Sequence, residues 1–260
     1  MFELLNKVRE KNPLVLHYTN EVTINDCANI TLALGGSPLM SYSHEEVEEV
    51  IQIASSVVIN IGTMNSNGIE LFLKAGKLAN KYNKPVLLDP VGVFATKTRA
   101  NLVKRLINEI NFTVIKGNIS EVKYIAGLKT SGQGVDSNED GLDLREEIKA
   151  ISNKLNTTVV ATGKVDFVSD GVSVIEIYNG TEKLKKVTGT GCMTGSLIAS
   201  YLGVTKKSIE AAAMGVLTMS LGGQLADKNN PSIGTFKVDL INEIYEMNIE
   251  KLEEMGKLKW

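Results

Sequence analysis

Val86-Leu-Leu-Asp-Pro-Val-Gly92 joins a short apolar run to a sharp break. A run of aliphatic residues bounded by Pro90 and Gly92 is typical of a strand that is buried on both faces of a parallel sheet. Asp89 follows the aliphatic residues directly, and a proline is not expected within a central strand. The stretch therefore predicts a buried strand over Val86–Leu88 with a carboxylate at its carboxyl end.

The same pattern recurs along the chain, where runs rich in β-branched residues alternate with longer stretches of helical period. Such alternation requires helical crossovers between parallel strands. It predicts an α/β architecture of three layers, with a central, mostly parallel sheet flanked by helices on both faces. The strands expected besides Val86–Leu88 are Leu14–His17, Val57–Ile61, Phe112–Ile115 and Thr158–Ala161.

The last part of the chain has a different pattern. Phe167–Ser169 and Val172–Ile177 surround Ser-Asp-Gly, which has the turn chemistry of a hairpin, so antiparallel strands are expected to end the sheet. Three helices are expected after the hairpin, and the second, rich in Ala and Met, is expected to be buried. They are Gly195–Leu202, Lys206–Ala226 and Val238–Lys251.

Composition limits the class of protein. The 260 residues are 43% hydrophobic and 22% charged, with a formal net charge of -2, which is ordinary for a globular protein with one large core. No long basic run suggests a nucleic-acid partner, so a small-molecule partner is expected. Lys129–Asp140 is a short polar stretch between predicted helices and is interpreted as a surface loop, so a single domain is expected over residues 1–260.

The sequence also predicts a cytoplasmic protein with no membrane contact. No segment approaches the roughly 20 unbroken apolar residues that a spanning helix needs. Residues 1–13 mix charges into a helical pattern and lack the apolar core of a signal peptide. With Cys27 and Cys192 as the two cysteines, neither a disulfide framework nor a four-ligand zinc site is expected within one chain.

Thr188-Gly-Thr-Gly-Cys-Met-Thr-Gly-Ser196 packs three glycines and four hydroxyls directly before an apolar helix. Successive backbone N–H groups at a helix amino end form an anion site. The stretch is not a P-loop, because no lysine follows Gly195, and it is not G-x-G-x-x-G, because the third glycine comes one residue late. From the spacing alone, a phosphate site and a tight turn with a helix cap are equally good interpretations.

Cys192 adds weight to a functional interpretation of this stretch. A thiol at a helix amino end can have a lowered pKa and act as a base or a nucleophile. A single cysteine is also often buried simply for packing, and the residue type alone leaves both interpretations open.

Polar residues follow several of the predicted strands. Asp89 and Glu121 both come after neighbouring strands, at the edge where open α/β sheets bind ligands, and could share a hydrated Mg²⁺. Each also has a structural alternative, since Asp89 could form an Asx turn and Glu121 has the spacing of a capping box with Asn118. Ala161–Asp166 forms a third polar turn at the same edge.

His17–Asn25 is an unusually polar stretch that follows the first strand. Asn20, Thr23 and Asn25 could each cap the next helix, but not all three together. His17 is assigned no chemistry, because a single histidine there is more often structural.

Taken in this order, the pieces resemble the hydroxyethylthiazole kinase family of the ribokinase-like superfamily. Any one of the matching segments is weak evidence, but their combination is specific and spans almost the whole chain. The segments are His17–Asn25, Cys27–Asn29, Leu34–Met40, Asp89–Gly92, Gly117–Glu121, Ala161–Asp166 and Thr188–Cys192.

The resemblance implies a ribokinase-like fold and a kinase that phosphorylates the primary alcohol of 4-methyl-5-(2-hydroxyethyl)thiazole in thiamine salvage or biosynthesis. ATP would be the phosphoryl donor and Mg²⁺ the metal. It further implies a ring-shaped homotrimer with the thiazole site between neighbouring subunits. A kinase for another alcohol, such as hydroxymethylpyrimidine, and a sensor that binds without turnover are the alternatives.

The resemblance also implies roles for individual residues. Cys192 would orient the alcohol and accept its proton, at a position where the wider superfamily carries an aspartate. Lys116 departs from the family pattern, which usually has an arginine there, and so loses the bidentate fork. The implied sets are Met40, Asn25 and Gly189 for the thiazole, Lys116, Thr162, Gly189, Thr190 and Gly191 for ATP and its phosphates, and Asp89 and Glu121 for the metal.

Overall fold

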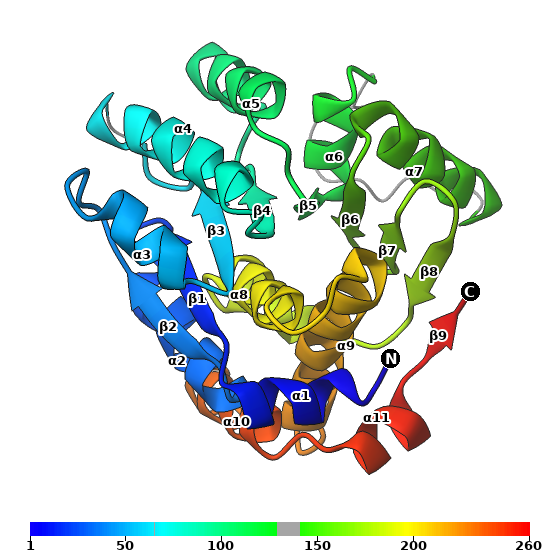
Figure 1. The fold of residues 1–260 in the computed structure, drawn as a ribbon. Coiled ribbons are helices and arrows are strands. Elements are labelled where there is room, and N and C mark those ends of the chain that lie inside the picture. Colours follow the sequence, from blue (N-terminus) through cyan, green and yellow to red (C-terminus); the bar gives the residue numbers. More distant parts are fainter. Residues whose placement is uncertain (65, 129–140) are drawn as a thin grey trace.

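The computed structural model describes residues 1–64, 66–128 and 141–260. These residues form one sheet of nine strands in the spatial order β2-β1-β3-β4-β5-β6-β7-β8-β9, with helices on both faces (Figure 1). The strands are β1 (Leu14–Tyr18), β2 (Ser37–Met40), β3 (Ser56–Asn60), β4 (Val86–Asp89), β5 (Val114–Asn118), β6 (Thr158–Thr162), β7 (Asp166–Ser169), β8 (Val174–Ile177) and β9 (Leu258–Lys259).

Helices connect the parallel strands and make up most of the last third of the chain. Each helix in the described part of the chain is too short or too polar to cross a lipid bilayer. The helices are α1 (Leu4–Lys11), α2 (Ile24–Leu34), α3 (Val47–Ile53), α4 (Ser66–Lys81), α5 (Lys97–Glu109), α6 (Ile119–Ile125), α7 (Gly141–Leu155), the 3₁₀ helix η1 (Glu182–Lys186), α8 (Thr190–Leu202), α9 (Ser208–Ala226), α10 (Ile233–Tyr245) and α11 (Ile249–Met255).

The first six strands run parallel to their neighbours, so their carboxyl ends lie along one edge of the sheet, here called the carboxyl edge. Asn60 of β3 pairs with Asp89 of β4, and Asn118 of β5 pairs with Thr162 of β6. The last three strands are antiparallel. Polar residues that end different parallel strands are therefore neighbours in space.

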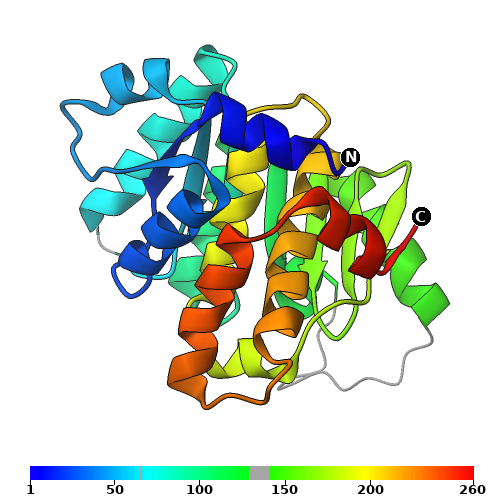
Figure 2. The same cartoon turned by 90° about the horizontal axis from the view of Figure 1, so that it is seen from below.

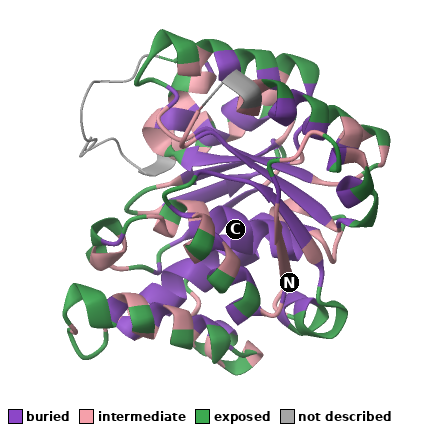
Figure 3. Cartoon of the chain, turned by 90° about the vertical axis from the view of Figure 1, so that its left-hand side faces the viewer, coloured by how far each residue is buried: buried purple, intermediate pink, exposed green. Residues whose placement is uncertain are grey.

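Both faces of the sheet are covered, which gives three layers. Figure 2 shows α8 and α9 side by side, with α10 and α11 outside them. Figure 3 shows the buried sheet between helices whose outer surfaces are exposed. Because successive side chains of a strand point to opposite faces, Val58 packs in one core with Leu197 of α8, whereas Ile59 packs in the other core with Leu71 of α4. The apolar strands are thus buried on both sides.

α8 packs tightly against both the sheet and its neighbour α9. Its residues from Met193 to Leu202 are all buried. A Cβ atom at Gly215 of α9 would lie 2.5 Å from Cγ1 and 2.6 Å from the backbone nitrogen of Ile198 in α8, so only glycine permits this approach of the two helices. The contact fixes where the amino end of α8 meets the carboxyl edge.

The predicted three-layer α/β architecture with a mostly parallel sheet is confirmed. The predicted strands correspond to β1, β3, β4, β5 and β6. Four of them agree with the prediction to within one residue at each end, but β5 runs over Val114–Asn118 instead of Phe112–Ile115. The reason is that Lys116, Gly117 and Asn118 continue the ladder with β6.

Two helix predictions need correction. α8 begins at Thr190 and not at Gly195, so two of the three glycines in the Thr188–Ser196 stretch lie within the helix and not in a turn before it. The predicted helix Val238–Lys251 is two helices, because the Asn248 side chain caps α11 by accepting a hydrogen bond of 2.8 Å from the backbone N–H of Lys251.

The edges of the sheet also differ from the prediction. The hairpin is confirmed as β7 and β8, but β9 pairs with β8 and extends the sheet beyond it. β2 was not predicted, since it contains Pro38, and a proline is tolerated there because β2 is an edge strand. The predicted surface loop Lys129–Asp140 lies outside the described residues.

Replacing Gly215 by alanine should separate α8 from α9, because the new methyl group meets the backbone of Ile198. We expect Gly215→Ala to lower the free energy of unfolding by about 2 kcal/mol, measured by urea denaturation. Gly234→Ala in α10 is the matched control, since nothing lies within 4 Å of its added methyl group. That variant should be neutral or slightly stabilised. Equal stability of the two variants would contradict this account of the helix contact.

Candidate active site

A row of hydrogen-bonded polar side chains crosses the carboxyl edge. Asn20, which follows β1, donates from Nδ2 to Oδ1 of Asn60 at the end of β3, over 2.9 Å. Asn60 donates from Nδ2 to Oδ2 of Asp89 at the end of β4, over 3.0 Å. The Nζ atom of Lys116 in β5 lies 3.4 Å from the same Asp89 oxygen. All four side chains are buried, so this polar row is shielded from water.

Asp89 is the centre of the row. Burial raises the pKa of its carboxyl to about 6, the negative charge of Glu121 adds to the increase, and the ammonium of Lys116 opposes it. Within the described residues, Oδ1 of Asp89 is buried and has no hydrogen-bond partner. A carboxylate with one bonded and one unbonded oxygen retains the capacity to accept a water or to bind a hard cation.

Lys116 brings a positive charge to this edge. Burial alone would lower its pKa, but the carboxylates of Asp89 and Glu121 raise the pKa above its usual value, so the side chain stays charged. The ammonium lies beneath the first turn of α8, where a Cβ atom at Gly191 would come within 3.3 Å of Nζ. Glycine at this position therefore lets the helix amino end approach a buried cation.

Glu121 forms the capping box that its spacing from Asn118 predicts. Its Oε2 accepts the backbone N–H of Asn118 over 2.8 Å, and Oδ1 of Asn118 accepts the backbone N–H of Glu121 over 2.8 Å. Its Oε1 accepts the backbone N–H of Gly92 over 2.8 Å. The carboxylate thus joins the loop after β4 to the start of α6, and it keeps lone pairs for a hydrated metal.

The amino end of α8 has the backbone geometry on which the expectation of an anion site was based. Gly189 caps the helix with φ of +92°, and a Cβ atom there would lie 2.6 Å from Cγ2 of Thr23. The N–H of Met193 donates to the Gly189 carbonyl and begins the helical hydrogen bonds. The N–H groups of the earlier residues in the first turn therefore have no acceptor within the helix. These groups, with the helix dipole, favour a negative charge.

Cys192 lies between this helix end and the polar row. Its Sγ accepts hydrogen bonds from Nδ2 of Asn20 and Nδ2 of Asn60, each over 3.3 Å. Burial raises the pKa of the Cys192 thiol and the charge of Asp89 raises it further, although Lys116 opposes both. A lowered pKa, which the sequence had left open, is therefore not found, because burial is the largest influence and raises it.

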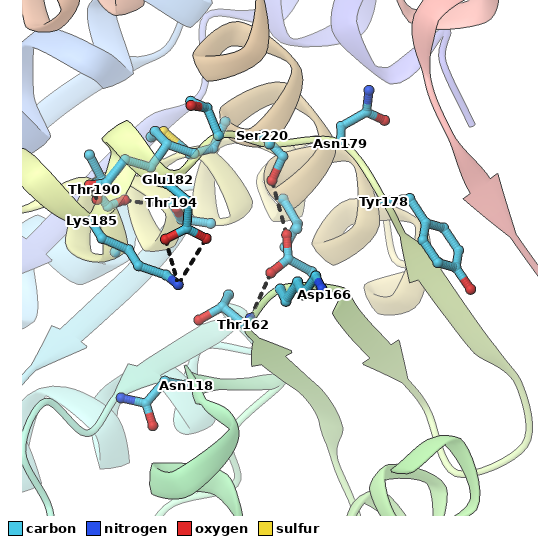
Figure 4. Close-up of a pocket in the computed structure, with 18 residues that line it drawn as sticks. Asn118, Thr162, Asp166, Tyr178, Asn179, Glu182, Lys185, Thr190, Thr194 and Ser220 are labelled. Atoms are coloured by element: carbon cyan, nitrogen blue, oxygen red, sulfur yellow. Dashed lines mark hydrogen bonds and ion pairs between the residues drawn. The ribbon is translucent and has the colours of Figure 1, made fainter. Parts of the chain in front are cut away.

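A cavity of about 560 Å³ opens beside the helix end. Figure 4 shows Thr190 and Thr194 of α8, Thr162 of β6 and Asn118 of β5 around one part of it, with Asn179 and Tyr178 farther along. Three residues expected to bind ATP or its phosphates, Thr162, Thr190 and Gly191, line this cavity.

Asp166 shapes the wall of the cavity. Its Oδ1 accepts the backbone N–H of Gly163 over 2.9 Å, and its Oδ2 accepts the hydroxyl of Ser220 in α9 over 3.0 Å (Figure 4). Burial raises the pKa of Asp166 to about 6 against the effect of these hydrogen bonds. The side chain holds the turn after β6 against α9.

Arg99 of α5 holds two loops of the site in place. Its Nη1 donates to the carbonyls of Ile61 and Val91, over 2.7 and 2.8 Å, and its Nη2 donates to the carbonyl of Gly62 over 2.8 Å. One guanidinium thus joins the loops that follow Asn60 and Asp89. It was not predicted, because a single arginine in a charged helix has no local signal for such a role.

The structure separates the predicted residues into two groups. Asp89, Lys116, Glu121 and Cys192 surround one point at the carboxyl edge, as the hydrogen bonds and charge interactions above require. Among the described residues, neither Met40 nor Asn25 lines the cavity. Met40 ends the edge strand β2, and Oδ1 of Asn25 accepts an amide hydrogen from Asn29 at the surface of α2.

Asn20 and Asn60 are the two site residues that gained their importance only in the structure. Asn20 had been considered only as a helix cap, and Asn60 had been placed inside a predicted strand. Asn60 does carry the same signal as Asp89, a polar residue at the carboxyl end of an apolar run. His17, assigned no chemistry, is buried with Nδ1 bonded to the carbonyl of Val15 and Nε2 bonded to Ser196, each over 3.0 Å.

Within the described residues, no three His, Cys, Asp or Glu side chains lie close enough together to hold a metal ion. Asp89 and Glu121 are two carboxylates at one edge, and Oδ1 of Asp89 is an acceptor without a protein donor. This donor set fits a cation that keeps several waters, as Mg²⁺ does, and does not fit an ion that needs an all-protein cage.

Comparisons with known proteins identify the family of the chain. Residues 5–250 match the model of the hydroxyethylthiazole kinase family. The chain is 60% identical over 260 residues to a hydroxyethylthiazole kinase of Clostridioides difficile strain 630, an alignment that covers 100% of this chain and 99% of the relative.

Two solved structures are similar in fold. A hydroxyethylthiazole kinase protein from Pyrococcus horikoshii OT3 superposes with a TM-score of 0.91 and 37% identity, over 99% of this chain and 97% of that one. A ribokinase-like superfamily protein from Enterococcus faecalis V583 superposes with a TM-score of 0.65 and 14% identity, over 93% and 94% of the two chains. The predicted ribokinase-like fold is confirmed.

The buried charge of Asp166 predicts a pH-dependent effect of its removal. Its folded pKa of about 6 exceeds the ordinary aspartate value of 3.8, so its ionisation destabilises the fold above about pH 6 and not below about pH 4. Asp166→Asn keeps the shape and the acceptor for Gly163. We expect the stability of this variant relative to wild type to increase by up to about 3 kcal/mol between pH 4 and pH 7.5, measured by urea unfolding. The same difference at both pH values would contradict the assignment.

Proposed function

The chain belongs to the hydroxyethylthiazole kinase family and is a kinase, and we propose that it transfers the γ-phosphoryl group of ATP to the primary alcohol of 4-methyl-5-(2-hydroxyethyl)thiazole. One observation carries the proposal. The amino end of α8, the Lys116 ammonium and the Cys192 thiol meet at the carboxyl edge, beside a cavity of about 560 Å³. Such an arrangement combines a positive pole for phosphate with a group that can interact with an alcohol.

We infer that ATP occupies the cavity with its phosphates at the helix end. The support is the lining, because Thr190 and Gly191 lie at that end and Thr162 ends the neighbouring strand β6. Lys116, beneath Gly191, would stabilise the charge that builds up on the transferred group. Lysine acts here as a point charge and does not offer the paired donors of an arginine.

Asp89 and Glu121 would hold Mg²⁺ through its waters, and the ion would neutralise charge on the phosphates. The support is the unpartnered Oδ1 of Asp89 and the negative charge that the two carboxylates share at one edge. Lys116 balances part of that charge in the absence of a ligand.

Cys192 would orient the alcohol and accept its proton late in the transfer. Phosphoryl transfer passes through a loose transition state, in which the alcohol keeps its proton until late and a base gives modest help. A raised thiol pKa is compatible with this role, since the thiolate that belongs to such a thiol is the stronger base.

We further propose a single kinase domain over residues 1–260 that forms a homotrimer with sites between subunits, acting in the cytoplasm in thiamine salvage or biosynthesis. One continuous sheet supports the single domain. The position of Met40 on the edge strand β2 is compatible with a thiazole site that a neighbouring chain completes. Both cysteines are free thiols, as is usual in a reducing compartment. Loss of specific activity on dilution would test the shared site.

The reaction is tested by ADP release from the purified protein with Mg²⁺ and ATP, with and without hydroxyethylthiazole. Thiazole-dependent release is expected. Hydroxymethylpyrimidine is the control alcohol, and turnover with the pyrimidine alone would overturn the substrate but keep the fold and chemistry. The absence of ADP release with either alcohol would favour a protein that binds without turnover.

Substitutions of Cys192 test its role. Cys192→Ala should lower kcat by roughly 10- to 100-fold without abolishing activity, because positioning and electrostatics supply most of the catalysis. Cys192→Asp should retain or raise the rate, since a carboxylate can accept the same proton. Steady-state kinetics on folded variants check both expectations, and complete loss of activity in a folded Cys192→Asp protein would rule out the base role.

A further inference from the structure

Two amide nitrogens from different parts of the sheet converge on one sulfur. Nδ2 of Asn20, after β1, and Nδ2 of Asn60, at the end of β3, each lie 3.3 Å from Sγ of Cys192. The two asparagines are also bonded to each other over 2.9 Å. Both are almost fully buried, at 3% and 1% exposure, so water does not compete for these bonds.

The orientation of each amide is fixed by backbone groups. Oδ1 of Asn20 accepts the N–H of Thr23 over 3.1 Å, and Oδ1 of Asn60 accepts the N–H of Gly62 over 2.9 Å. A backbone N–H can only donate, so the amide oxygens must face these groups. The two NH₂ groups must then face Cys192.

Every hydrogen of the two amides has an acceptor. Nδ2 of Asn60 donates to Oδ2 of Asp89 and to the sulfur of Cys192. Nδ2 of Asn20 donates to Oδ1 of Asn60 and to the same sulfur. An NH₂ group donates and does not accept, so the sulfur is the acceptor in both bonds. The thiol hydrogen is therefore not used by either asparagine.

We propose that Asn20 and Asn60 are positioning residues that hold the Cys192 sulfur in place as a hydrogen-bond acceptor and stabilise its thiolate. Donors to the charged form of an acid favour that form. The inference deepens the proposed function, on which its catalytic meaning rests, because a thiolate must form if Cys192 accepts the proton of the alcohol.

The charged groups around the sulfur act on the thiolate in opposite directions. Asp89 of β4 disfavours the thiolate, and Lys116 of β5 favours it. Cys27 of α2 is a buried thiol whose pKa is itself raised, and Asp26 is neutralised by an ion pair with Lys237. The amides of Asn20 and Asn60 keep their effect whatever the charge of these neighbours.

The test measures the pKa of the Cys192 thiol directly. The rate of iodoacetamide alkylation of Cys192 is followed against pH by peptide mass spectrometry, with the Cys27 peptide as internal reference. In Asn20→Ala and Asn60→Ala the pKa of Cys192 should increase by about one unit relative to wild type, because one hydrogen bond to a charged group is lost. The kcat for the thiazole alcohol should fall about 10-fold or more in the same variants.

Two further variants separate positioning from folding. Asn80→Ala removes an amide of α4 that bonds the backbone of Asn111, away from the carboxyl edge. This variant should leave the pKa of Cys192 and kcat unchanged. Asn60→Asp keeps the acceptor for Gly62 and the side-chain shape but removes both donors, so it tests the proposal if the alanine variants fail to fold. The pKa of Cys192 should increase by more in Asn60→Asp than in Asn60→Ala.

An unchanged Cys192 pKa in folded Asn20→Ala and Asn60→Asp overturns the proposal, whether or not the protein is an active kinase. An increased pKa in Asn20→Ala or Asn60→Ala upholds the amide–thiolate interaction even if wild type releases no ADP with hydroxyethylthiazole. In that case the kinase assignment fails separately, so the two ideas are distinguished.

Discussion

The buried ion pair of Lys116 and Asp89 is the interaction on which the arrangement of the site depends. Removing two charges from water costs several kcal/mol each, which is recovered only with good geometry and further hydrogen bonds. Here Nζ and Oδ2 are 3.4 Å apart, and one Asp89 oxygen has no partner among the described residues. The pair is thus incomplete without a ligand. The proposed phosphates at the helix end and the proposed hydrated cation at Asp89 would complete it.

The position of α8 decides whether this pair can meet a phosphate. Three glycines make the approach possible, each against a different neighbour. Gly215 lets α9 pack closely against α8. Gly191 lets the first turn of α8 lie close to the Lys116 ammonium, and Gly189 lets the chain pass close to Thr23. The helix amino end and the buried cation therefore act on the same point.

The loops around this point are held by hydrogen bonds of a few polar side chains. Arg99 joins the loops after β3 and β4, Glu121 joins the loop after β4 to α6, and Asp166 joins the turn after β6 to α9. Fixed loops favour catalysis by positioning, in which donors and charges are in place before the substrate arrives. That agrees with a reaction that requires little covalent help from the protein.

The sequence by itself determined what depends on near neighbours in the chain. Strand and helix periods predicted the parallel sheet, a polar residue after an apolar run located Asp89, and the spacing of Asn118 and Glu121 predicted a capping box. Tertiary structure alone decided the rest. Asn20 meets Cys192 across 172 residues, and Arg99 reaches Gly62 across 37. The pKa of Cys192 is raised chiefly by burial, and burial depends on packing between distant segments, which no local pattern specifies.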